Sequence, residues 1–366
     1  MSIDKRQLRA TLAMLGTIIG AGVFAIPSVF RQYGIAWGSV VYWAIAGMVV
    51  ATHVLLSEVI LEKSAFSRIR LPGMVTAVFG KWWGKVAFLS HPGQTIGACL
   101  AYIILGGEFL YALGGAHFVH SLLFWQVLFW AGGALTVFVG LHFVAKVEAW
   151  LTWLLILALI LSVFLFGRIA DPTLFFQMQG GWAWSPIGIL VFSLFGLTSI
   201  PEIMEIAGSD RDPAQRSIAF GSLGAAALMW FFGVTAYAAA PDVAASASGY
   251  ASVLSEKTRW IIPVIGFLAV ATSFITLMEG LKRMLMTDAK IEKNTAKVLA
   301  LSAPLVLLFT TQRNFLSTVS FVGGFFSAIN GIFATTMAVK VKKIQWPLLI
   351  AVFFLFLLIS RILNLK

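Results

Sequence analysis

Two short segments of the chain place glycine, proline and hydroxyl residues in the middle of long apolar stretches. The first covers residues 16–27 (GTIIGAGVFAIP), and the second covers residues 195–202 (FGLTSIPE). Glycine and proline suit an unwound backbone better than a continuous helix. In apolar surroundings, unwound backbone is tolerated only where its amide and carbonyl groups face a cavity or a ligand. The pattern therefore predicts that both segments bind a small polar molecule through backbone groups.

The two segments predict recognition of a zwitterion. The amides of Ala21, Gly22 and Val23 lie where a half-helix would start, and the partial positive charge there suits a carboxylate. Carbonyls freed at each break would accept hydrogen bonds from an ammonium group. The rings of Phe192 and Phe195 would line a pocket for the substrate side chain. We therefore expect an α-amino acid to bind at the backbone of Thr17, Ile18, Gly20, Ala21, Gly22, Val23, Phe195 and Gly196.

Helix packing is the alternative explanation for these glycines. Glycine is common in membrane helices, and a small-xxx-small pair such as Gly16 and Gly20 usually marks close contact between two helices. The binding hypothesis predicts that a bulky residue at Gly22, such as leucine, abolishes binding and leaves folding intact. The packing hypothesis predicts that this variant retains its affinity.

Membrane-spanning helices are the elements that must carry the two segments. Of the 366 residues, 60% are hydrophobic and only 11% are charged, and the mean hydropathy is +0.92. This composition excludes an ordinary water-soluble globular protein. A helix needs about 20 apolar residues to cross the hydrocarbon core. By this rule the chain has eleven spans, near residues 8–30, 36–60, 86–113, 121–141, 149–168, 185–206, 216–240, 260–281, 297–311, 315–338 and 345–363.

The distribution of charge indicates membrane topology rather than nucleic-acid binding. The formal net charge is +11. With a cytoplasmic N-terminus, 19 of the 26 Lys and Arg residues fall in cytoplasmic segments and 7 in outer segments, in agreement with the positive-inside rule. We therefore expect a multi-pass protein of the cell membrane (inner or plasma membrane), in contact with lipid. The single cysteine, Cys99, excludes an intrachain disulfide.

The spans are organised as five plus five plus one. Residues 1–168 hold five spans, residues 185–340 hold five more, and residues 341–366 hold the eleventh. Because five is odd, the two groups of five begin on opposite sides of the membrane, and each begins with a broken stretch. This arrangement predicts an inverted repeat with a substrate site at its broken helices, as in secondary transporters.

Four segments form a recognisable set of motifs: residues 20–27 with Tyr33, Gly34 and Gly38, residues 101–108 (AYIILGGE), residues 195–202 and residues 271–274 (ATSF). They resemble the first, third, sixth and eighth helices of amino acid permeases in the amino acid/polyamine/organocation superfamily, above all its amino acid/auxin and hydroxy/aromatic amino acid permease branches. The resemblance implies an all-α polytopic membrane protein with a LeuT-type 5+5 inverted repeat plus one extra helix.

The resemblance also implies roles outside the two breaks. Tyr102 belongs to the third helix, which flanks the substrate in this fold, so it would bond the carboxylate, close the pocket or simply pack. Thr272 and Ser273, with the carbonyl of Ile19, correspond to a sodium site or to its proton-coupled remnant. Hydroxyl and carbonyl oxygens suit a small cation. The alternative is that the two hydroxyls bond carbonyls of their own helix.

Ionisable residues inside a membrane are costly and therefore suggest function. His53 is the first candidate proton carrier, because imidazole titrates nearest to neutrality, and Glu202 is the second; a hydrogen-bonded structural role is the alternative for His53. Ser199 and Glu202 also form a capping-box pattern that would restart the helix near Ile200. Glu279 falls near a predicted cytoplasmic end, where pairing with a basic residue explains it.

These observations predict a secondary active transporter of amino acids that works by alternating access as a symporter. The coupling ion is H⁺ or Na⁺, and protons are favoured because the most similar aromatic permeases resemble proton symporters. No Walker-type motif is present, the histidines lack metal-ligand spacing, and no channel filter repeats. We therefore expect no enzyme activity, no cofactor and no metal beyond a Na⁺ ion. The alternatives are a transporter-like amino acid sensor and a carrier of another small amine or organic cation.

Overall fold

The structure, a computed structural model, describes residues 5–62, 66, 69–115, 118–139, 141–177, 183–208, 210–242, 249, 252, 254, 256 and 258–363. Within these ranges the chain forms helices and no strands. The α-helices are α1 (Lys5–Ile18), α2 (Ile26–Tyr33), α3 (Ile35–Glu62), α4 (Leu71–Phe79), α5 (Lys81–Leu110), α7 (Leu122–Val139), α8 (Leu141–Gly167), α9 (Ser185–Leu194), α10 (Ile200–Ala207), α11 (Arg211–Ala239), α13 (Ile261–Thr287), α14 (Lys293–Thr310), α15 (Phe315–Phe321), α16 (Ala328–Lys342) and α17 (Pro347–Ile362). Short 3₁₀ or π-helical segments are η1 (Ala21–Ala25), η3 (Tyr111–Gly115), η4 (Pro172–Phe176), η5 (Leu197–Ser199) and η6 (Val322–Ser327).

Apart from α4, which falls between the second and third stretches, the α-helices occupy the eleven predicted stretches in order. The first stretch consists of α1, η1 and α2, the sixth of α9, η5 and α10, and the tenth of α15, η6 and α16. Among the described residues, six helices are long and apolar enough to cross a membrane, and the bent pair formed by α1 and α2 makes a seventh. The apolar parts of α7, α8 and α17 are shorter. α14 carries Lys293 and Lys297 at its start, which lowers its apolar character.

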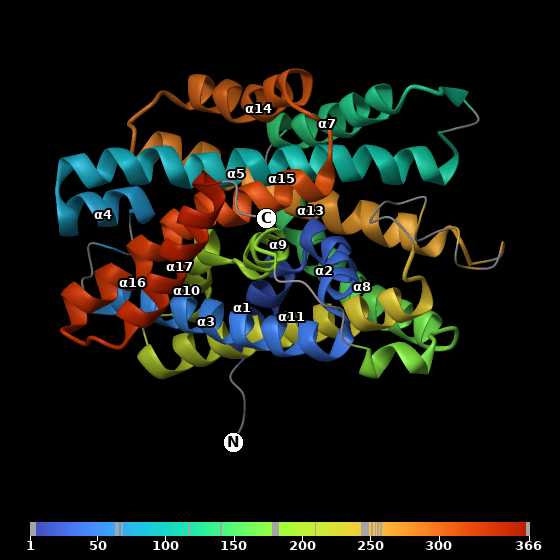
Figure 1. The fold of residues 1–366 in the computed structure, drawn as a ribbon. Helices are drawn as coiled ribbons and strands as arrows, with labels where there is room; N and C mark the ends of the chain where they lie inside the picture. The colour runs from blue at the N-terminus through green and yellow to red at the C-terminus, as the bar shows by residue number, and fades with distance from the viewer. Residues whose placement is uncertain are drawn as a thin grey trace.

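The two broken stretches lie at the centre of the bundle (Figure 1). α1 packs against α10 and α11, and α9 packs against α2, α3 and η1. α3 and α11 pack together on one side of this central group, and α5 and α13 pack together on the other. The long outer helices therefore enclose the segments whose backbone is not continuously helical.

The first broken stretch changes direction after α1. α1 ends at Ile18, the chain turns at Gly20, and the helical parts before and after the turn make an angle of 47°. The amide of Gly20 donates to the carbonyl of Ile18 at 2.9 Å, which closes the turn. Pro27 lies in the first turn of α2, where its missing N–H removes no helix hydrogen bond.

The second broken stretch restarts at Ile200, as the sequence predicts. α9 ends at Leu194, and α10 begins at Ile200 after the short turn η5. The predicted capping box is wrong, because the Ser199 side chain makes no cap hydrogen bond. Glu202 instead pairs with Arg70, with 2.7 Å between the guanidinium nitrogen and the carboxylate oxygen. A carboxylate in apolar surroundings is stabilised more by a paired cation than by one backbone amide.

Glycines bring neighbouring helices into close contact. A β-carbon on Gly323 of η6 would lie 1.9 Å from the carbonyl oxygen of Gly188 on α9. A β-carbon on Gly233 of α11 would lie 2.3 Å from the side chain of Ile26 on α2. Lipid-facing helices gain little from hydrophobic association, so such close packing supplies much of the attraction between them.

One end of the bundle collects the ion pairs of the described residues. Glu62, at the end of α3, pairs with Lys342 at 2.5 Å and with Arg211 at 3.3 Å. Glu279 pairs with Lys282 within α13, the kind of pairing expected for it. We call this the ion-paired end. The pairs link the ends of α3, α11 and α16 and leave the middle of the bundle to uncharged contacts.

We expect Gly323→Ala to lower the thermal stability of the purified protein in detergent. The added methyl would collide with the Gly188 backbone, and overpacking of this kind costs about 1–3 kcal/mol. Gly47→Ala in α3 is the matched control, because no atom lies within 4 Å of its β-carbon position. Thermal unfolding of the two variants measures the difference. An unchanged melting temperature for Gly323→Ala would contradict the close contact between α9 and η6.

Candidate binding site

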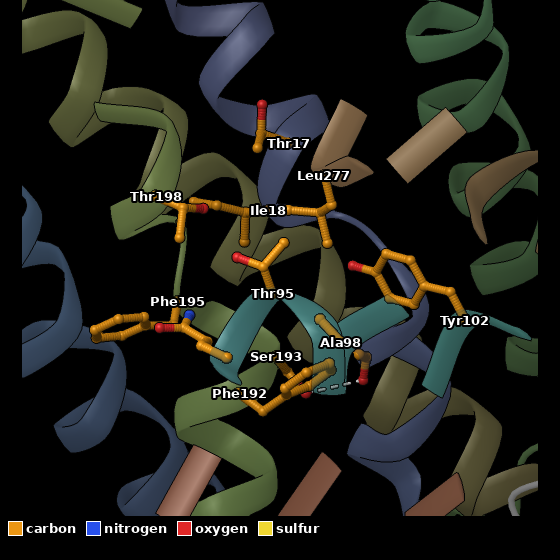
Figure 2. Close-up of a pocket in the computed structure, with 13 residues that line it drawn as sticks. Thr17, Ile18, Thr95, Ala98, Tyr102, Phe192, Ser193, Phe195, Thr198 and Leu277 are labelled. Carbon is orange, nitrogen blue, oxygen red and sulfur yellow. Dashed lines mark hydrogen bonds between the residues drawn. The ribbon is translucent and has the colours of Figure 1, made fainter. Parts of the chain in front are cut away.

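A cavity lies where both broken stretches face α5 (Figure 2). Its lining residues are Thr17, Ile18, Gly22, Gln94, Thr95, Ala98, Tyr102, Phe192, Ser193, Phe195, Gly196, Thr198 and Leu277. Seven of the ten residues predicted to bind substrate are among them. The other three, Gly20, Ala21 and Val23, are buried beside the cavity without lining it.

The two breaks contact each other closely at glycine and serine residues, which have no side chain or a short one. A β-carbon on Gly196 would lie 2.8 Å from Cγ1 of Ile18, and one on Gly22 would lie 2.6 Å from Cα of Ser193. The Ser193 hydroxyl also lies 3.0 Å from the carbonyl oxygen of Gly22 (Figure 2), within donating distance. It lies 2.8 Å from the carbonyl oxygen of Ile189, which is within donating distance as well. Leucine at Gly22 would therefore push against the backbone of α9. The variant Gly22→Leu therefore does not separate the two hypotheses, because leucine there would disturb the packing against α9 whether or not Gly22 binds a ligand.

The three amides predicted to bind a carboxylate differ in their partners. The Val23 amide donates to the carbonyl of Gly20 at 3.3 Å, within the turn. The backbone of Ala21 is hydrogen bonded with the hydroxyl of Tyr102. Gly22 is the one of the three that lines the cavity. Of the three amides, the one we expect to bind an anion is therefore that of Gly22, with the Tyr102 side chain close by.

The Tyr102 hydroxyl lies in the space that Gly20 leaves open. A β-carbon on Gly20 would lie 2.5 Å from the Tyr102 oxygen and 3.2 Å from Oγ of Ser273. The Tyr102 hydroxyl is hydrogen bonded with the Ser273 side chain as well as with Ala21. α5, α13 and the first break thus meet at one hydroxyl group.

The two residues predicted to hold a cation are in different surroundings. Ser273 meets the first break through Tyr102. The Thr272 hydroxyl lies 2.9 Å from the carbonyl of Leu268 and 3.1 Å from that of Ala269, which is the intrahelical bonding given above as the alternative. Among the described residues, no group of three His, Cys, Asp or Glu side chains is placed to hold a metal ion.

His53 connects the second break to α3 and α11. Its side chain is fully buried, and its Nε2 accepts a hydrogen bond from the Gly196 amide at 3.0 Å. Its Nδ1 lies 3.0 Å from Oγ of Ser222. Because Nε2 accepts, the ring proton is on Nδ1, which donates to Ser222, and the imidazole is neutral in this arrangement. These two hydrogen bonds match the alternative given above for His53, a hydrogen-bonded structural histidine. Its structural role is to hold the backbone of the second break at Gly196.

The two phenylalanines predicted for the side-chain pocket point in different directions. The Phe192 ring lies within the group of lining side chains in Figure 2, whereas the Phe195 ring points away from it. The Phe195 ring instead packs edge-on against His53 and Phe354, with centroid distances of 6.0 and 6.1 Å. Phe195 therefore lines the cavity without turning its ring into it, and its ring supports the break from the side of His53 and Phe354.

The profile of the tryptophan/tyrosine permease family matches residues 4–352. This chain belongs to that family. Among solved structures, it is similar to MhsT in complex with L-phenylalanine (TM-score 0.66, 16% identity, 97% of this chain and 98% of that chain). It is also similar to Mhp1 in an inward-facing conformation (TM-score 0.61, 14% identity, 98% of this chain and 89% of that chain). A search of curated protein sequences found no match.

These comparisons confirm the amino acid permease resemblance and the fold class. The permease is an all-α integral membrane protein with the LeuT-type fold, and it is a transporter rather than an enzyme. Identities of 14–16% carry the fold and not the details of a site. The role of each residue in this permease must therefore be argued from its own contacts.

Six lining residues of the permease were not predicted from the sequence. They are Gln94, Thr95, Ala98, Ser193, Thr198 and Leu277. Gln94, Ala98 and Tyr102 are spaced four residues apart on α5 and therefore share one face of that helix. The sequence signal that could have identified Gln94 and Ala98 was therefore their four-residue spacing from Tyr102, which was a predicted site residue. Glu202, in contrast, does not line the cavity, although Thr198, one turn before it, does.

We expect Tyr102→Phe to weaken binding of the substrate amino acid about fivefold, because a lost hydrogen bond is worth about 1 kcal/mol. Tyr42→Phe is the matched control. The Tyr42 hydroxyl donates to the carbonyl of Ala226 at 2.7 Å and does not line the cavity. Equilibrium binding to the purified permease measures both. Equal affinities in Tyr102→Phe, Tyr42→Phe and wild type would contradict a place for the Tyr102 hydroxyl in the site.

Proposed function

We propose that the permease carries an aromatic α-amino acid across the cell membrane by alternating access, with the substrate held between the two breaks. The cavity bounded by both breaks carries the proposal, in a chain of the tryptophan/tyrosine permease family. The similar MhsT structure contains L-phenylalanine, which favours the same chemical class. The rings of Phe192 and Tyr102 supply aromatic contact surface in the cavity.

The charge of the cavity favours a zwitterion. None of the lining residues has a charged side chain, so a net anion or cation would lack a counter-ion there. A zwitterion can be held by backbone dipoles. The Gly22 amide would bind its carboxylate, beside Tyr102, and carbonyls of both breaks would bind its ammonium. The carbonyls of Ile18 and Gly196 each accept one backbone hydrogen bond, at 2.9 and 3.1 Å, and keep a second lone pair for the ammonium.

The moving units in this proposal are the two repeats. Residues 1–168 form the first and residues 185–340 the second, and residues 341–366 add the eleventh helix. The ion-paired end faces the cytoplasm, together with the N-terminus, because the basic residues gather there. In this proposal, the ion pair between Arg70 and Glu202 closes the way from the cavity at Thr198 to the ion-paired end. The pair does so by joining the segment before α4 to α10.

Proton coupling through His53 fits this geometry better than coupling through Glu202. The bond from the Gly196 amide exists only while Nε2 of His53 is unprotonated. A proton on Nε2 breaks that bond and frees the second break to move. Three of the charged residues on the helices packed against α3 are engaged elsewhere: Glu202 pairs with Arg70, and Lys342 and Arg211 pair with Glu62.

Uptake into proteoliposomes tests transport and coupling together. We expect L-tryptophan and L-tyrosine to accumulate when the outside is acidic, and a sodium gradient alone to drive no uptake. His53→Gln should keep substrate binding and lose the response to the pH gradient, because glutamine preserves both hydrogen bonds but takes no proton. Binding without any uptake would favour a sensor. Uptake that follows sodium and fails in Thr272→Ala/Ser273→Ala would assign coupling to the sodium site instead.

Labelling of single cysteines tests the proposed orientation. In a Cys99→Ala background, we expect Arg211→Cys to react with an impermeant maleimide only from the cytoplasmic side. Phe176→Cys is the matched control at the other end, since Phe176 is 89% exposed in η4 between the fifth and sixth spans. It should react only from outside. The reverse pattern would overturn the proposed orientation.

A further inference from the structure

Gln94 is a polar side chain of the cavity that the proposed transport cycle does not use. It belongs to α5, lines the cavity and is 7% exposed. A primary amide in apolar surroundings is costly unless its oxygen and its nitrogen both have partners. Its partners therefore indicate what the cavity is built to bind.

A chain of buried hydrogen bonds orients the Gln94 amide. Ser90 of α5 donates to Oδ1 of Asn330 on α16 at 2.7 Å, and Nδ2 of Asn330 donates to Oε1 of Gln94 at 2.6 Å. A hydroxyl has one proton to donate. Because Ser90 gives this proton to Asn330 rather than to the carbonyl of Ala87, which is 3.3 Å away, the Asn330 nitrogen must face Gln94. The Gln94 oxygen is then committed to Asn330.

The Gln94 nitrogen is left for the cavity, with two N–H donors. We propose that Ser90, Asn330 and Gln94 form a specificity element that donates a hydrogen bond to an oxygen atom at the far end of the substrate side chain. This inference rests on the proposed function, because it requires an amino acid bound with its carboxylate near Gly22 and Tyr102.

The spacing on α5 suits an aromatic amino acid. Gln94 and Tyr102 are eight residues apart, which is about 12 Å along a helix. That length accommodates the molecule from its carboxylate to its para position with a hydrogen bond at each end. Thr95 completes the far end: its hydroxyl lies 3.2 Å from the carbonyl of His91 and donates to it, so its oxygen can accept the phenol proton.

Tyrosine fits this element and tryptophan does not. A phenol oxygen accepts a hydrogen bond, whereas the indole N–H only donates and phenylalanine offers no polar atom. Tryptophan or phenylalanine would leave the Gln94 N–H groups unpaired. A site built to bond a substrate hydroxyl rejects analogues that lack it more strongly than an apolar pocket rejects a change in size. We therefore expect the wild-type permease to prefer L-tyrosine to L-phenylalanine and to L-tryptophan.

Competition binding to the purified permease tests the element. We expect Gln94→Leu to reduce the preference for L-tyrosine over L-phenylalanine about 10- to 100-fold, because the variant loses the hydrogen bond to L-tyrosine and no longer leaves an unpaired amide beside L-phenylalanine. Gln126→Leu is the matched control: Gln126 of α7 is 1% exposed, does not line the cavity, and neither of its amide atoms has a hydrogen-bond partner. The preference should be the same in this variant as in wild type.

Ser90→Ala provides a second readout from outside the cavity. Without the Ser90 proton, the amides of Asn330 and Gln94 can reverse and turn an oxygen toward the substrate. Affinity for L-tryptophan should rise relative to L-tyrosine, which a merely structural role would not produce. An unchanged ratio in both Gln94→Leu and Ser90→Ala, or a loss of L-tryptophan rather than L-tyrosine in Gln94→Leu, would overturn the proposal. Failure of the wild type and of Gln126→Leu to bind any of the three amino acids would instead refute the proposed function.

Discussion

A backbone group inside a bilayer must find its hydrogen-bond partner within the protein, and the two breaks meet this requirement with side chains from neighbouring helices. His53 of α3 accepts from the Gly196 amide. Ser193 of α9 lies within hydrogen-bond distance of the carbonyl of Gly22. Tyr102 of α5 bonds the backbone of Ala21. Each partner also fixes the position of its own helix relative to a break, so the surrounding bundle is organised around the unwound backbone.

The glycines of the breaks make these bonds geometrically accessible. Gly22 allows Ser193 to reach a carbonyl, and Gly20 leaves room for the Tyr102 hydroxyl. In the proposed function, packing and binding are therefore compatible explanations for the glycines rather than alternatives. Because these glycines have no side chain, a neighbouring helix comes close enough to form hydrogen bonds with backbone groups of the break. At Gly22, the missing side chain also leaves the backbone at the cavity wall.

Local patterns in the sequence predicted what depends on local physics. Apolar length located the eleven helical stretches, and glycine with proline located both breaks to within a few residues. The interactions that could not be predicted join residues distant in the chain. Glu202 has a capping partner three residues away in the sequence, yet it pairs with Arg70. The direction of the Phe195 ring likewise depends on Phe354, which packs against it from α17.

Gln94 shows a different limit of sequence reasoning. A charged residue in an apolar span suggests a function because it is costly there, whereas a neutral amide gives no such signal. The hydrogen bond between Gln94 and Asn330 of α16 joins residues far apart in the sequence, so no local pattern predicts it. The signal that existed was helical spacing, because Gln94 and Ala98 precede Tyr102 by two turns and one turn on the same face of α5.

The uncharged cavity also restricts how a coupling ion can act in the proposed cycle. With no charged side chain at the cavity wall, protonation cannot change substrate affinity by adding or removing a direct counter-charge. It must instead act through backbone geometry, and the Gly196 amide is the place where this is feasible. That amide belongs to the break that faces the substrate cavity, and its acceptor is the one imidazole nitrogen whose protonation removes the bond. A proton at His53 would therefore change the shape of the site first, and its charge would be felt by the substrate only across the intervening break.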